Sequence, residues 1–247
     1  MHGKHFFENF WNSEQKNELF VCMPFNNSFD DKFKKIDNVA KKLGFDKATR
    51  TKEGWMANDI VHEILDGIGN SKTLLFDVSN IPETSRVNEN VLYELGIADA
   101  IREPEDFLLI REKSDIKLPF DVSHIRYNEY EGDLQESWLK EKLEEVLKGQ
   151  NWFKSRRIEA AAKSIDSAGF DLILKLYPTN LVNEDHFNDL SIGDNPIAKL
   201  AILRLIDLGI IWFATENLGE GKYGYAYHWT PFGREVIKYL NIKKIKT

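Results

Sequence analysis

Residues 73–101 read TLLFDVSNIPETSRVNENVLYELGIADAI, and they carry the clearest signal of the fold class. Residues 73–79 form a short, mostly apolar run, which is the pattern of a strand covered on both faces of its sheet. Residues 90–101 place apolar side chains at helical spacing. A strand followed by a helix is the repeating unit of α/β proteins, so the stretch predicts one such unit of a mainly parallel sheet.

The same alternation of strand and helix patterns runs through the first half of the chain. Strand patterns lie at residues 19–23 (LFVCM), 45–50, 106–112 and 124–130, the last as an edge strand. Helix patterns lie at residues 29–44, 60–70 and 133–148. Regular alternation favours a parallel sheet with helices on both faces, so we predict a flavodoxin-like α/β domain over residues 1–150.

A second domain is predicted over residues 151–247, because the pattern changes near GQNWFKS (149–155), which we interpret as the junction. Helix patterns follow at residues 156–177, 195–209 and 231–240. Aromatic-rich strand patterns lie at residues 210–215 and 223–230. A helix, a β-hairpin and a helix in that order predict a smaller, winged-helix-like α+β domain.

The charge is unevenly spread along the chain, whose formal net charge is −7. Residues 1–155 hold 21 Lys and Arg against 29 Asp and Glu, whereas residues 156–247 hold 12 against 11. Attraction to nucleic-acid phosphates needs clustered positive charge. The acidic first part therefore argues against nucleic-acid binding there.

Composition also bounds metal chemistry and location. Cys22 is the only cysteine, so an internal disulfide is excluded; it lies in an apolar run, and we expect it in the core. The six histidines lack ligand spacing, so no metal site is predicted. We find no long apolar run and no secretory signal, so we expect a cytoplasmic protein without a membrane span.

The segment GEGKYG (219–224) matches the G-x-G-x-x-G fingerprint of dinucleotide-binding domains. That fingerprint functions only between a strand and the start of a helix. Strand patterns flank the segment on both sides here, so we interpret it as a hairpin turn.

Glu94 is a carboxylate among apolar neighbours, and burial of an unpaired charge is costly. A capping box would explain an acid three residues after the helix cap. If Asn90 is the cap, that position is Tyr93, and Glu94 comes one residue too late. The helix dipole remains as a structural explanation, and it predicts a carboxylate that stays ionised at neutral pH. The apolar neighbours suggest instead a carboxylate aimed into a cleft.

Asp77 ends the buried strand at residues 73–79, and a lone aspartate there is typical of a turn. Ligands of α/β sheets bind beyond the carboxyl ends of the strands, so we expect Asp77 and Glu94 at one sheet edge. One carboxylate could hold ribose hydroxyls while the other stabilises an oxocarbenium-like transition state. Further candidate binding residues at these strand ends and turns are Phe25, Asn26, Arg50, Ser79, Asn88 and Asn90.

Four segments, taken in order, resemble the bacterial TIR-like nucleotide-binding proteins, relatives of TIR domains and nucleoside 2-deoxyribosyltransferases. They are FVCMPFNNSFDDKF (20–33), TLLFDVS (73–79), NENVLYELGIADA (88–100) and KLPFDVSHIRYNEY (117–130). The resemblance covers residues 17–147. It implies that Glu94 is the essential glutamate, that Asp77 is the strand-end aspartate, and that the loop with Phe25 and Asn26 contacts base or ribose.

The resemblance implies a hydrolase that cleaves the N-glycosidic bond of NAD, works as a homo-oligomer, and acts in antiphage defence. NAD would be the substrate, and no other cofactor is expected. The usual NPN reads Asn88-Glu89-Asn90 here, and a further aspartate common in the transferases is replaced by Asn88. A 2-deoxyribosyltransferase-like enzyme and a non-catalytic nucleotide-sensing regulator stay open as alternatives.

The second domain has two interpretations, a protein-interaction module and a DNA-binding winged helix. Its helix near 195–208 offers Lys199 and Arg204, but Asp194 and Asp207 also lie there or adjacent. Its apolar residues are expected mostly in the core: Ile197, Leu200, Ala201, Leu203, Leu205, Ile206 and Leu208. DNA binding requires more positive charge than this helix offers, so we favour a protein partner and place DNA second.

Overall fold

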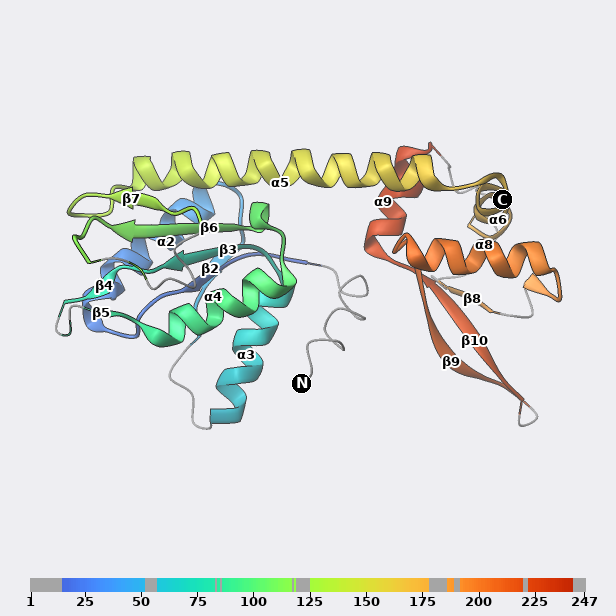
Figure 1. Ribbon diagram of the computed structural model, residues 1–247, viewed down its shortest axis with the longest axis horizontal. Helices are drawn as coiled ribbons and strands as arrows, with labels where there is room; N and C mark the ends of the chain where they lie inside the picture. The colour runs from blue at the N-terminus through green and yellow to red at the C-terminus, as the bar shows by residue number, and fades with distance from the viewer. Residues whose placement is uncertain are drawn as a thin grey trace. The chain divides into compact units, whose positions relative to one another are not determined.

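The computed structural model describes residues 15–51, 57–82, 84, 86–116, 118, 125–177, 186–188, 192–219 and 222–241 (Figure 1). These residues form two compact units, Gln15–Trp152 and the part from Phe153 onward. The boundary lies inside one helix, α5 (Glu136–Ser164), so the segment at 149–155 is helical. Each unit is described by itself.

The first unit is built on a five-stranded parallel sheet (Figure 1). Its strands are β1 (Lys16–Cys22), β2 (Lys47–Thr49), β3 (Ser71–Asp77), β6 (Phe107–Glu112) and β7 (Asn128–Tyr130). They lie in the order β2-β1-β3-β6-β7. Numbered within the sheet this is 2-1-3-4-5, the flavodoxin-like order, and the predicted α/β class is confirmed.

Helices cover both faces of this sheet, as predicted. One face packs against α2 (Asp30–Lys42) and the first part of α5, and the other against α3 (Ala57–Asn70) and α4 (Glu89–Ile101). Alternation along β1 divides its side chains: Val21 faces α2, whereas Phe20 and Cys22 face α4. The connections from β1 and β3 leave in opposite directions, so the sheet's switch point lies between these two strands.

Some elements of the first unit were absent from the sequence prediction. A small antiparallel pair, β4 (Asn80–Ile81) and β5 (Arg86–Val87), lies between β3 and α4. Two short 3-10 turns, η2 (Asn27–Phe29) and η3 (Pro104–Asp106), precede α2 and β6. All four are too short to produce a periodic pattern in the sequence.

The second unit combines helices with a three-stranded antiparallel sheet of order β8-β10-β9. Its elements beyond α5 are α6 (Ser167–Leu176), β8 (His186–Asn188), α8 (Pro196–Asp207), β9 (Ile211–Gly219), β10 (Lys222–Trp229) and α9 (Pro231–Tyr239). The predicted helix–hairpin–helix order is confirmed, and β8 is an addition. GEGKYG spans the hairpin, as predicted, since β9 ends at Gly219 and antiparallel β10 begins at Lys222.

The helix predicted over residues 156–177 is in fact two helices. The Asp166 side chain caps the second, α6, by accepting a hydrogen bond from the amide of Gly169 at 2.7 Å. Such a cap satisfies a free amide at the start of a helix. The break therefore follows from a local hydrogen bond that the apolar periodicity does not reveal.

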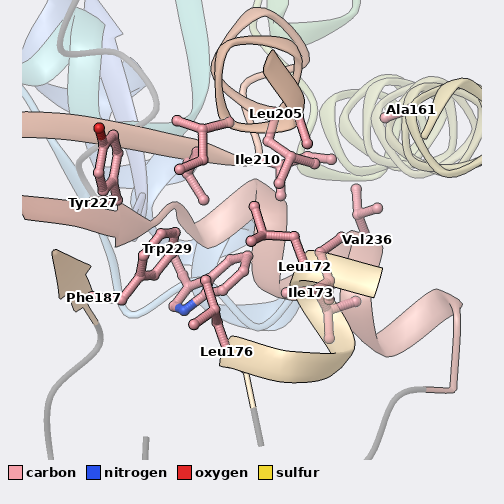
Figure 2. Packing of buried hydrophobic residues seen from close by; sticks show 14 of the residues in the cluster. Ala161, Leu172, Ile173, Leu176, Phe187, Leu205, Ile210, Tyr227, Trp229 and Val236 are labelled. Atoms are coloured by element: carbon pink, nitrogen blue, oxygen red, sulfur yellow. The ribbon is translucent and has the colours of Figure 1, made fainter. Parts of the chain in front are cut away.

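An aromatic group lies at the centre of the second unit's core (Figure 2). The ring centroid of Phe187 lies 5.2 Å from that of Tyr227 and 5.4 Å from that of Trp229. Leu205, from α8, and Val236, from α9, are buried in the same cluster. Residues of four helices, α5, α6, α8 and α9, and of all three strands thus share one core.

The start of α9 packs directly on the chain ahead of β9. Thr230 accepts a hydrogen bond from the amide of Gly233 at 2.7 Å and donates one to the Gly209 carbonyl at 2.7 Å. A Cβ on Gly233 would lie 2.0 Å from the Ile210 carbonyl oxygen. Only glycine fits at this contact.

Within the described ranges of both units, no helix is long and apolar enough to span a membrane.

Candidate functional site

The carboxyl edge of the parallel sheet holds polar atoms that are buried without a hydrogen-bond partner. Within the described part of the first unit these are Arg50 Nη1, Asp77 Oδ2, Asn80 Oδ1 and Arg111 Nε. Each lies at, or just beyond, the carboxyl end of β2, β3 or β6. Buried polar atoms are nearly always hydrogen-bonded, so this concentration of exceptions marks the edge as the candidate site.

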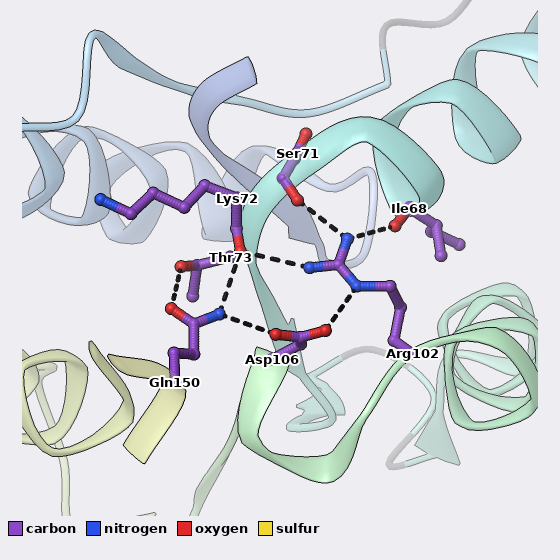
Figure 3. A network of polar contacts seen from close by, with 7 residues as sticks. All are labelled: Ile68, Ser71, Lys72, Thr73, Arg102, Asp106 and Gln150. Atoms are coloured by element: carbon purple, nitrogen blue, oxygen red, sulfur yellow. Dashed lines mark hydrogen bonds and ion pairs between the residues drawn. The ribbon is translucent and has the colours of Figure 1, made fainter. Parts of the chain in front are cut away.

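At the amino edge of the same sheet, by contrast, the buried side-chain polar atoms of the described residues all have hydrogen-bond partners, as in the network around Arg102 (Figure 3). The buried Arg102 donates to the carbonyls of Ile68, Ser71 and Lys72, at 2.8, 2.8 and 3.2 Å. Its Nε donates to Asp106 at 2.9 Å, which completes an ion pair. The unsatisfied atoms are therefore confined to one end of the sheet, where α/β folds bind ligands.

Glu94 lies well inside α4 and is 7% exposed. The cap of this helix is Asn88, not Asn90 as assumed from the sequence, because Asn88 accepts hydrogen bonds from the amides of Asn90 at 2.9 Å and Val91 at 3.4 Å. Glu94 is then the sixth helical residue, beyond the capping-box position at Val91. Helix-dipole stabilisation fades beyond the first turn, so neither explanation accounts for a buried acid here.

The polar neighbour of Glu94 is the thiol of Cys22, at the carboxyl end of β1. Burial raises the pKa of Glu94, and the interaction with Cys22 only partly opposes this. Burial therefore works against the ionised form expected for Glu94, because it disfavours the charged form of a carboxyl group. Burial and the nearby Glu94 also raise the pKa of Cys22, which is 3% exposed and lies in the core as predicted.

Asp77 is fully buried at the end of β3. Its Oδ1 accepts a hydrogen bond from the amide of Ser79 at 3.0 Å. The Ser79 hydroxyl in turn accepts from the amide of Glu112 at 2.8 Å and lies 3.3 Å from the Tyr130 hydroxyl. Asp77 therefore belongs to a polar cluster that joins the ends of β3, β6 and β7.

Lys32, in the first turn of α2, supplies the positive charge of this cluster. Its ammonium group donates to Glu112 at 2.8 Å and lies 5.3 Å from the centre of the Tyr130 ring. Burial raises the pKa of Asp77 despite the opposing charge of Lys32. Burial and the charge of Asp77 raise the pKa of Tyr130 to about 12. Lys32, Glu112 and Tyr130 were not predicted as site residues, since nothing in the sequence brings these distant segments together.

Asp77 and Glu94 lie at the same edge, as predicted, but they face opposite sides of the sheet. Asp77 is paired in register with Ile110 and alternates with Phe76, so it faces α2. Glu94 reaches the sheet from α4 and meets Cys22 on the other face. The structure therefore does not bring the two carboxylates together as a facing pair.

The loop after β1 places its two predicted residues differently. Phe25 is 45% exposed. The Asn26 side chain accepts a hydrogen bond from the amide of Ser28 at 2.9 Å, which caps η2. Phe25 is therefore the more available of the two for a ligand.

The remaining predicted binding residues are partly engaged in the fold. Arg50 donates to Asp30 at 2.6 Å and lies 4.6 Å from the Phe33 ring centre, while its Nη1 has no hydrogen-bond partner in the described chain. Asn88 is the cap of α4, and Asn90 is exposed in its first turn. A cap role accounts for Asn88 without a ligand.

The exposed face of α8 corrects one expectation for the second unit. Ala201 and Leu205 are buried as expected, but Ile197, Leu200 and Leu203 are 66%, 69% and 59% exposed. The surface that would enter a DNA groove thus carries exposed apolar side chains beside the charged Lys199, Arg204 and Asp207.

No protein-family model and no curated protein matches the chain. Among solved structures, the chain is similar to a mutant of a flavo di-iron protein from Thermotoga maritima, with 17% sequence identity and a TM-score of 0.41. The match covers 56% of this chain and 37% of that one, so the chain spans well under half the length of that protein.

Proposed function

We propose that the first unit binds a nucleotide at the carboxyl edge of its sheet and cleaves the N-glycosidic bond of NAD, with Glu94 as the catalytic carboxylate. One observation carries this proposal: Glu94 is buried beside the end of β1, at the switch point, where no cap or dipole role explains it. The resemblance of four sequence segments to TIR-like proteins supports the same assignment.

In this reaction the bond between ribose C1′ and the nicotinamide nitrogen breaks, and its electron pair leaves with nicotinamide. Positive charge develops on the ribose, and a carboxylate in a water-poor site stabilises it strongly. The pyridinium of NAD would also favour the charged form of Glu94, since an opposite charge lowers a carboxyl pKa. Water then adds at C1′ to give ADP-ribose and a proton.

The test measures nicotinamide release from NAD by the purified full chain. Glu94→Gln keeps the shape of the side chain but removes its charge, and we expect turnover to fall about 100-fold or more. Glu89→Gln, at the exposed first position of the same helix, is the matched control and should keep wild-type turnover. Equal turnover by Glu94→Gln and wild type would rule out the catalytic assignment.

Nucleotide sensing without turnover is the second candidate. It is favoured by the burial of both carboxyls, which raises the pKa of Asp77 and of Glu94 and so opposes the charged form that catalysis needs. A ligand of the folded state raises the melting temperature, so stabilisation by NAD without nicotinamide release would support the sensor. Base exchange between a deoxynucleoside and a free base would instead indicate a 2-deoxyribosyltransferase.

For the second unit we propose a protein partner ahead of DNA. The exposed side chains of Ile197, Leu200 and Leu203 favour an apolar contact, and the nearby Lys199 is paired with Asp194 at 3.0 Å. The wider proposal, taken from the resemblance, is a cytoplasmic homo-oligomer in antiphage defence. Salt-sensitive binding of the full chain to duplex DNA would contradict the choice of partner.

A further inference from the structure

Arg111 is a buried cation that forms no ion pair with any carboxylate in the part of the chain that the structure describes. It is 2% exposed and is among the largest fully buried side chains. In the described chain its Nη2 donates to the Ile116 carbonyl, its guanidinium lies 5.9 Å from the centre of the Tyr127 ring, and its Nε has no hydrogen-bond partner. No described carboxylate forms an ion pair with it. A guanidinium stays charged, so this arrangement is costly for the fold.

The sheet places Arg111 on the same face as Glu94. Arg111 alternates with Ile110, which faces α2, and follows Leu109 on the face toward α4. The Val78 amide donates to the Ile110 carbonyl at 3.0 Å, so Arg111 stands at the very end of β3's pairing with β6. It therefore shares both the face and the edge that Glu94 occupies.

The strand order sets the lateral separation between the two groups. Cys22, which contacts Glu94, ends β1, and Arg111 lies two strands away across β3 on β6. Neighbouring strands are about 4.8 Å apart, so two strand spacings amount to roughly 10 Å. A nucleotide that presents its ribose to Glu94 has its phosphates within this reach.

The guanidinium is close to the surface although it is buried. Its carbonyl acceptor belongs to Ile116, which is 41% exposed in the loop directly after β6. A phosphate is a better acceptor than a carbonyl for arginine, because it carries charge and accepts two parallel hydrogen bonds. Exchange of the carbonyl for a phosphate would supply the missing anion.

We propose that Arg111 binds a phosphate of the ligand, and that the site therefore takes phosphorylated nucleotides in preference to nucleosides. This inference rests on the proposed function, since it assumes that the ligand's ribose lies at Glu94. Arg111, which has no predicted role from its sequence position, would then determine the class of substrate.

The experiment compares two ligands that differ by one phosphate, nicotinamide mononucleotide and nicotinamide riboside, and adds ADP-ribose as a stable ligand. In Arg111→Met we expect the dissociation constants of both phosphorylated ligands to rise roughly tenfold to 100-fold. The constant for nicotinamide riboside should stay unchanged. Arg86→Met, which removes an exposed arginine at the same edge, is the control for loss of one positive charge.

A melting curve of Arg111→Met separates binding from folding. Replacement of a buried, unpaired charge by an apolar side chain of similar length is often neutral or stabilising, so we expect an equal or higher melting temperature. A misfolded or clearly less stable variant would assign Arg111 to the fold and overturn the proposal. The proposal would also be overturned if the variant and the wild type bound ADP-ribose equally well, or if the wild type did not bind it.

The outcome is independent of turnover. Arg111-dependent binding of ADP-ribose with no cleavage of NAD would contradict the proposed hydrolase but uphold the phosphate site. Cleavage of NAD by the wild type, together with unchanged dissociation constants in Arg111→Met, would support the hydrolase and contradict the phosphate site.

Discussion

The two edges of the parallel sheet each bury one arginine, and they treat it in opposite ways. At the amino edge Arg102 makes four hydrogen bonds, three to carbonyls and one to Asp106 (Figure 3). At the carboxyl edge Arg111 has one carbonyl acceptor and an unpartnered Nε in the described chain. Satisfied buried polar groups rigidify a fold, whereas unsatisfied ones are costly and cluster at functional sites. The difference indicates that the polar contacts of the amino edge maintain the fold, and it supports the proposal of a ligand site at the carboxyl edge.

The largest expected effect tests the amino edge. Arg102→Met removes the ion-pair partner of Asp106 and the side-chain donor of the Ile68 and Ser71 carbonyls. We therefore expect the free energy of unfolding to fall by about 3–5 kcal/mol. Urea unfolding followed by circular dichroism measures it. Arg111→Met is the matched variant at the other edge, and we expect its value to change by less than about 1 kcal/mol. Similar losses in both variants would remove the distinction between the edges.

A smaller effect tests how tightly the chain packs ahead of β3. Gly67, near the end of α3, has no room for a side chain, because a Cβ there would lie 2.3 Å from a ring carbon of Phe20. We expect Gly67→Ala to lower the free energy of unfolding by about 1–3 kcal/mol. Gly96→Ala, inside α4 with no atom within 4 Å of the added Cβ, should raise it by about 0.5–1 kcal/mol. A harmless Gly67→Ala would show looser packing than the structure has.

The smallest effect concerns pH and the carboxyl edge. Burial raises the pKa of Asp77, so the folded protein binds this proton more readily than the unfolded chain. The contribution of Asp77 to stability then falls as pH rises from its ordinary pKa of 3.8 through the raised folded-state pKa, and it is constant above. Asp77→Asn lacks this titration.

As pH rises through this range, the free energy of unfolding of Asp77→Asn should therefore increase relative to that of the wild type. The measurement is urea unfolding of both proteins at a series of pH values. A difference that shrinks as pH rises would mean that Lys32 stabilises the charged form more than burial opposes it.

The fold could be predicted from sequence because its signals are local. The apolar runs at β1, β3 and β6 and the helix pattern of α4 each repeat over enough residues to be recognised, and regular alternation implies the parallel sheet. The break before α6 was missed because one side-chain cap at Asp166 determines it. The strand β8 was missed because three residues are too few for a period.

The site was only partly predictable, because the position of a residue in the sequence indicates which edge of the sheet it lies at but not which face of the sheet it is on. Asp77 and Glu94 were placed at the correct edge, yet the side of the sheet depends on strand register and helix packing. The Lys32 cluster joins α2, β6 and β7, which are far apart in sequence. Arg111 lies in the stretch REKSD, where charged neighbours suggest a surface. Its burial becomes evident only in three dimensions.

Cys22 gives the carboxyl edge a natural chemical reporter. It is the chain's only thiol, it is 3% exposed, and it lies against Glu94. A small alkylating reagent can reach it only when the end of β1 separates from α4, so its reaction rate follows that local opening. Any ligand that occupies the space over Glu94 should slow the alkylation, whether or not it is cleaved, and the unaltered protein can thus be used to screen for ligands.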